Sequence, residues 1–65
     1  MTRGEIISTA HAVIELVQEE RRVPEGLVFA ALMGGLSAEA FETMLQQVVR
    51  SGLVKRVDHE LVWVG

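Results

Sequence analysis

The segment from Ser37 to Gly52 carries the most complete set of helix signals in the chain. Ser37 is a good N-cap residue because its hydroxyl accepts a hydrogen bond from an N–H group that the first helical turn leaves without a partner. Gly52 suits the position just past a helix C-terminus, where the backbone often adopts a left-handed conformation. Apolar side chains between them recur at spacings of three and four and predict one buried face. They are Phe41, Met44, Leu45 and Val48.

Two further helices are predicted before this segment. Residues 2–22 place apolar side chains at helical spacing, and Thr2 with Glu5 matches a capping box at the start. Residues 24–33 form the second predicted helix, because Pro24 suits the first helical position, where its missing N–H is not needed. The residues of this helix expected to face the core are Leu27, Val28, Ala31 and Leu32.

The β-prone stretch 53–64 ends the chain and predicts a hairpin with its turn within 58–60. A two-residue loop would place Val54 opposite Trp63, whereas a three-residue loop would place Lys55 there. A slip of one residue reverses which side chains face the core, and the sequence leaves both registers open.

The predicted fold class is α+β and mostly helical, with three helices and a C-terminal two-stranded hairpin in one domain over residues 1–65. Arg22 and Val23 are expected to add a very short strand before the second helix. This order resembles the winged helix-turn-helix superfamily, in which the third helix enters the DNA major groove and the hairpin, or wing, reaches phosphate or the minor groove. The resemblance rests on Pro24-Glu25-Gly26-Leu27, Gly35-Leu36-Ser37, Leu45 with Val48, and Ser51-Gly52-Leu53-Val54.

The resemblance implies a nucleic-acid-binding face on the third helix and the wing. Gln46 and Gln47 would hydrogen-bond adenine edges, and Arg50 would contact guanine or phosphate. The implied function is that of a DNA-binding transcriptional regulator or accessory domain. Its expected nucleic-acid contacts are Thr43, Gln46, Gln47, Arg50, Lys55 and Arg56.

The charge of the chain argues against that function. The net charge is −3, whereas nucleic-acid-binding modules usually carry a basic patch. Glu39 and Glu42 lie in the early turns of the third helix, and Asp58 and Glu60 lie at the wing tip, where carboxylates repel phosphate. The alternative function is therefore a protein-interaction or dimerisation module that does not bind DNA directly.

The hydrophobic content of the chain supports that alternative. Hydrophobic residues make up 49% of the sequence, which is more than so small a domain is expected to bury internally. We expect part of this surface to meet a protein partner, in the simplest case as a homodimer. The candidate partner interface is Leu16, Phe29, Met33, Val62 and Trp63.

No constellation of catalytic or metal-binding residues stands out. The chain has no cysteine, and His11 and His59 have no further ligands at metal-binding spacing. No enzymatic activity, cofactor or metal is expected, because no nucleophile has a base near it in sequence. The sequence has neither an export signal nor an apolar run of membrane length, so a cytoplasmic location without a membrane partner is expected. The start at Met1 favours a stand-alone product or an N-terminal domain.

Overall fold

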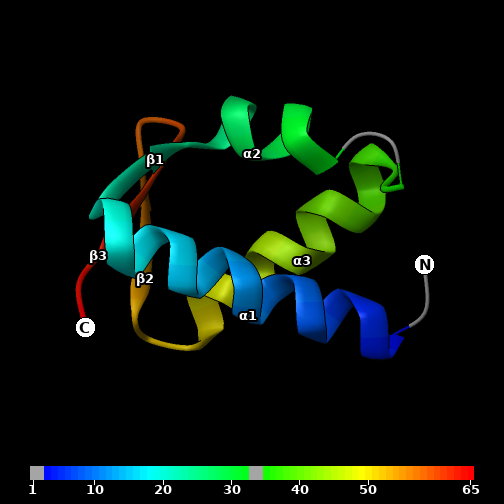
Figure 1. Cartoon of the computed structure of the whole chain (residues 1–65), viewed down its shortest axis with the longest axis horizontal. Helices are drawn as coiled ribbons and strands as arrows, with labels where there is room; N and C mark the ends of the chain where they lie inside the picture. Colours follow the sequence, from blue (N-terminus) through cyan, green and yellow to red (C-terminus); the bar gives the residue numbers. More distant parts are fainter. Residues whose placement is uncertain (1–2, 33–34) are drawn as a thin grey trace.

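The computed structural model describes residues 3–32 and 35–65. In Figure 1 the helices make up most of the molecule, and the strands lie at the end where α1 finishes. The elements are, in order, α1 (Arg3–Glu20), β1 (Arg22–Pro24), α2 (Glu25–Leu32), α3 (Ala38–Arg50), β2 (Val54–Val57) and β3 (Glu60–Trp63). The predicted α+β, mostly helical class is confirmed. No helix within the described ranges is both long and apolar enough to cross a membrane.

The C-terminal hairpin has the shorter of the two predicted loops. Val54 lies opposite Trp63 and Lys55 opposite Val62, which leaves two residues, Asp58 and His59, in the turn. Their φ angles are 50° and 64°, and a two-residue type I′ turn requires positive φ at both central positions. The turn conformation therefore selects the register that the sequence left open.

The sheet contains one strand more than the predicted hairpin. β1 pairs antiparallel with β3, and the strand order is β1-β3-β2. The Trp63 N–H donates to the Arg21 carbonyl at 2.8 Å and extends this pairing. The short strand expected at Arg22-Val23 is thus confirmed. It turns the expected two-stranded wing into a three-stranded sheet because it covers the free edge of β3.

The third helix begins and ends as predicted. The Ala40 N–H donates to the Ser37 hydroxyl oxygen at 3.1 Å, which confirms the N-cap. Gly52 has a φ of +79° directly after the helix, and its N–H donates to the Val49 carbonyl at 3.1 Å. The four apolar residues of the predicted inward face are all buried: Phe41, Met44, Leu45 and Val48.

The core lies between α1, α3 and the inner face of the sheet. Its fully buried large side chains are Val17, Met44, Leu45, Val48 and Leu61. α1 ends at Glu20 and not at the predicted residue 22, because Arg21 adopts a φ of 72° and turns the chain into β1. The capping box predicted at Thr2 falls outside the described residues.

α2 departs furthest from its predicted pattern. It begins at Glu25, because Pro24 is still paired with β3, and its predicted extension to Met33 lies outside the described residues. In the stripe predicted to face inward, Val28 is buried and Leu32 half-buried, but Ala31 is exposed and Leu27 is 64% exposed. The prediction for Leu27 and Ala31 is wrong.

An aromatic contact joins α2 to α3. The Phe29 ring packs edge-on against the Phe41 ring of α3, with centroids 4.9 Å apart and an interplanar angle of 70°. Phe29, expected to meet a protein partner, is instead half-buried and packed against the core. The predicted stripe of α2 still lies on the side toward α1, but an unfilled groove separates the two helices there and leaves Leu27 and Ala31 exposed.

Candidate functional site

The outward face of α3 carries the polar residues predicted to contact nucleic acid. Thr43, Gln46, Gln47 and Arg50 are all exposed, and their spacings of three and four place them on one side of the helix. The Thr43 hydroxyl donates to the Glu39 carbonyl at 3.1 Å, so its hydrogen is used within the helix. The two glutamines and Arg50 remain directed away from the core.

Two shallow hollows flank this face. Gln46, Val49, Arg50 and Arg56 line one of about 380 Å³ between α3 and β2. Another, of about 310 Å³, lies between α3 and the first two turns of α1. Its lining residues are Arg3, Ile6, Ile7, Thr43 and Gln47. Arg3 could not be predicted as part of this site, because no local signal shows that the start of α1 packs beside α3.

Arg56 is held in a cluster of ion pairs. Its Nε and Nη2 atoms donate to the two carboxylate oxygens of Glu25, both at 2.9 Å, and its Nη1 atom donates to Glu42 Oε1 at 2.7 Å. The hydrogen bonds to Glu25, and then those to Glu42, raise the pKa of the Arg56 guanidinium above its ordinary value. The cluster joins β2 to the start of α2 and to α3.

The register of the hairpin explains why Arg56 points toward the helices. Arg56 lies opposite Leu61, and residues directly opposite in an antiparallel pair project from the same face of the sheet. Leu61 is fully buried on the inner face, so Arg56 leaves the sheet on that side. Lys55 projects from the other face, opposite Val62. Adjacent basic residues in the sequence therefore serve different surfaces.

The predicted positive surface is consequently reduced. Arg56 is neutralised by Glu25 and Glu42, and a strip from Arg50 across Lys55 and Arg56 is interrupted there. Arg50 and Lys55 are exposed, and no ion pair joins either of them to another residue in the described ranges.

The acidic residues are distributed unevenly. α1 contains one arginine and four glutamates, so it carries a net charge of −3, equal to that of the whole chain. The remaining basic and acidic residues cancel. Two of the four carboxylates that argued against DNA binding are paired, Glu42 with Arg56 and Glu60 with Arg22. α3 adds a net charge of −1 and the hairpin is neutral, so most of the negative charge lies in α1.

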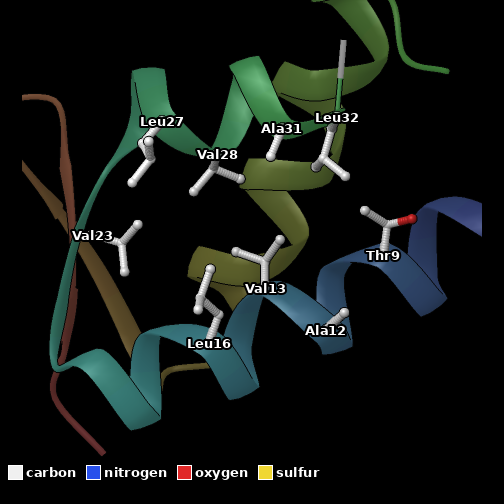
Figure 2. Close-up of a pocket in the computed structure, with 9 residues that line it drawn as sticks. All are labelled: Thr9, Ala12, Val13, Leu16, Val23, Leu27, Val28, Ala31 and Leu32. Atoms are coloured by element: carbon white, nitrogen blue, oxygen red, sulfur yellow. The ribbon is translucent and has the colours of Figure 1, made fainter. Parts of the chain in front are cut away.

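A second surface is an apolar groove of about 340 Å³ between α1, β1 and α2. Figure 2 shows the side chains of both helices and of Val23 directed into the space between them. Leu16 and Leu27 stand at its edges and are 41% and 64% exposed. The groove is lined by Thr9, Ala12, Val13, Leu16, Val23, Leu27, Val28, Ala31 and Leu32.

The five residues predicted to contact a partner do not gather in one place. Leu16 lines the groove, whereas Phe29 packs against Phe41. Val62 and Trp63 are half-buried and adjacent on β3, so they project from opposite faces of the sheet. Met33 lies outside the described residues. The exposure of Leu27 could not be predicted, because an almost uniformly apolar helix does not indicate which of its residues the core leaves uncovered.

Comparison with protein-family models, curated proteins and solved structures found no match. Within the described ranges, no three histidine, cysteine or acidic residues lie close enough to hold a metal ion. His11 is exposed on α1, and His59 is exposed in the β2–β3 turn. The polar face of α3 and the apolar groove are the two surfaces on which a function can be argued.

Proposed function

We propose that the protein is a winged helix that binds duplex DNA through the outward face of α3. The observation that carries this proposal is the placement of Gln46, Gln47 and Arg50 on one exposed helix face, while α1 has a net charge of −3 and α3 only −1. The order helix, strand, helix, helix and hairpin supports it, because this is the layout the winged-helix resemblance predicts. DNA binding suits either a transcriptional regulator or an accessory domain.

The chemistry of the α3 face suits the major groove. An α-helix with side chains is about 10–12 Å across and fits a groove about 12 Å wide. The amides of Gln46 and Gln47 can bond adenine edges, and the Arg50 guanidinium can bond guanine or phosphate. Arg3 lies at the margin of this face, beside Thr43 and Gln47, and supplies one phosphate contact. Lys55 supplies another from the outer face of the wing. With so few free cations, binding should be weak and easily reversed by salt.

A salt titration tests the proposal. Fluorescence anisotropy of a labelled duplex would be measured at several salt concentrations for the wild type, Arg50→Gln and Lys55→Gln. Each phosphate contact contributes about 0.9 to the slope of log K against log salt, so each variant should lower the slope by about that amount. Arg21→Gln removes the same charge just after the end of α1, at a residue that lines neither hollow beside α3, and is the matched control. Absence of wild-type binding at low salt, or equal weakening by Arg21→Gln, would contradict the proposal.

The second candidate function is that of a protein-interaction module. The observation that favours it is the apolar groove, with 64% of Leu27 exposed at its edge. Self-association is its simplest form, and the protomer mass is 7.2 kDa. Light scattering at increasing concentration distinguishes a homodimer, which would double that mass, from a monomer that binds another protein.

A further inference from the structure

We propose that the groove between α1 and α2 binds an amphipathic helix of another protein, whose apolar stripe is bordered by lysine or arginine. This inference rests on the second candidate function and is independent of DNA binding by α3. The groove specifies the chemistry of the occupant in two ways, by its apolar lining and by the charge of one edge.

The lining indicates what enters the groove. Val13, Val23 and Val28 are buried and form its floor, and Leu16 and Leu27 stand partly exposed on its two sides. Thr9 is the one polar residue in the lining. An apolar channel between two helices is the surface into which a partner helix lays residues spaced three and four apart. A polar or extended segment would leave its backbone groups without partners here.

The two edges of the groove differ in charge. On α1, Glu19 and Glu20 follow Leu16 by three and four residues, so they lie on the same side of the helix as Leu16. Both glutamates are exposed. The α2 edge is uncharged, and its exposed residues are Gly26, Leu27, Ala30 and Ala31. Cations on the occupant would therefore lie along the α1 edge, while its apolar side chains meet Leu27 and the valines.

A second copy of the chain fits this groove poorly. A symmetric dimer would bring another α1, with its own net charge of −3, to the interface. The one basic residue of α1 is Arg3, at the opposite end of the helix from Glu19 and Glu20. Charge complementarity thus selects a basic partner helix over self-association.

Two synthetic helical peptides test the proposal directly. Both would be about 18 residues long, long enough to form a helix, with leucines at the same three- and four-residue spacings. One would carry lysine on the remaining positions and the other glutamate. Anisotropy of the labelled peptides should show saturable binding of the lysine peptide, and binding of the glutamate peptide at least about tenfold weaker.

Variants of the protein then locate the binding. Leu27→Gln should lower the affinity for the lysine peptide at least about tenfold. Leu53→Gln changes a partly exposed leucine outside the groove and should leave that affinity unchanged. The double variant Glu19→Gln with Glu20→Gln should lower the affinity for the lysine peptide by up to about fivefold for each charge removed. Glu39→Gln removes one such charge from α3 and should leave peptide binding unchanged. All these positions are exposed, and circular dichroism would verify that each variant folds.

Three outcomes would overturn the inference. The first is no saturable binding of the lysine peptide at concentrations up to about 1 mM. The second is binding that Leu27→Gln leaves unchanged. The third is a doubled mass in light scattering that Leu27→Gln abolishes, because the groove would then hold a second copy. None of these results bears on the DNA salt series with Arg50→Gln, so the two proposals can fail separately.

Discussion

α2 and α3 follow one another in the chain but obtain their orientation in different ways. α3 alternates apolar and polar residues at the helical period, and its buried and exposed faces are the ones that pattern predicts. α2 has a single charged residue, Glu25, at its first position, and all its other residues are glycine or apolar. No polar side directs it outward, and the apolar stripe that it turns toward α1 is left partly uncovered.

The difference teaches what a hydrophobic pattern can specify. An amphipathic period specifies both that a helix is buried and which face is buried. A uniformly apolar helix specifies burial without direction, and a small core cannot cover all of it. In this protein the uncovered part is the side of α2 that carries Leu27, and it forms one wall of the groove. The polar face of α3 and the apolar wall of α2 are thus products of two kinds of sequence.

The largest expected effect contrasts one leucine from each helix. Leu45 of α3 is fully buried and Leu27 of α2 is 64% exposed. Leu45→Ala should lower the free energy of unfolding by about 3 kcal/mol, because it removes buried methyl groups and leaves a cavity. Leu27→Ala should change it by less than about 0.5 kcal/mol. Urea denaturation followed by circular dichroism measures both values. Similar losses for the two variants would show that α2 is as well packed as α3.

The ion-pair cluster at Arg56 connects the two helices and gives the next effect. Arg56→Met should lower the free energy of unfolding by about 1–2 kcal/mol, since it leaves the largely buried Glu25 side chain without its partner. Because the Arg56 side chain is 33% exposed and that of Glu42 is 50% exposed, solvent screening keeps the loss at this modest level. Lys55→Met, at the adjacent residue on the other sheet face, is the control and should change stability by under about 0.5 kcal/mol. A larger loss for Lys55→Met would contradict the assignment.

The cap of α3 is expected to matter slightly less. Ser37→Ala removes the acceptor of the Ala40 N–H bond and should lower the free energy of unfolding by about 1 kcal/mol. Ser8→Ala, on the exposed face within α1, should be neutral or slightly stabilising, because alanine has the higher helix propensity. The two thermal unfolding curves provide the test. An equal loss of unfolding free energy in both variants would show that the Ser37 cap does not specifically stabilise α3.

The sequence predicted the elements whose signals are local. Ser37, Gly52 and the apolar period of α3 mark a helix without reference to the rest of the chain, and all of these predictions are confirmed. The short strand at Arg22-Val23 was also predicted. Its partner could not be predicted, because pairing with β3 joins residues about forty positions apart and depends on how α1 turns at Arg21.

The candidate sites depend on such distant contacts, and the sequence indicated them only in part. The exposed α3 face followed from the helical period. The capture of Arg56 by Glu25 and Glu42 did not, because it requires the hairpin register and the position of α2 together. The groove was missed for the same reason, since Leu27 was assigned to the core from a pattern that has no polar side.

A smaller effect tests how the Arg56 cluster limits DNA binding. Glu42→Gln removes a negative charge from α3 and weakens the hold on Arg56, so it should raise affinity for duplex DNA by about threefold to fivefold at low salt. Glu15→Gln makes the same change on the exposed side of α1 and should have little effect. The anisotropy titration described above measures both. If Glu15→Gln raised the affinity equally, only net charge would matter, and the α3 face would lose its assigned role.

The smallest effect is an expected absence of pH dependence in the Arg56 cluster. The pKa of Arg56 is raised on folding, so the stability that this residue confers is fully present below its ordinary pKa and is lost only above it. The difference in unfolding free energy between the wild type and Arg56→Met should therefore be constant from about pH 7 to pH 11. The difference in unfolding free energy between Arg56→Lys and Arg56→Met should shrink above about pH 10, because an unfolded lysine loses its proton there. Urea denaturation at each pH supplies the values, and effects of other titrating groups cancel between variants. The stabilities of the wild type and of Arg56→Lys, each relative to Arg56→Met, could instead fall together above about pH 10. That result would mean that the guanidinium is not the charge that holds α2 to α3.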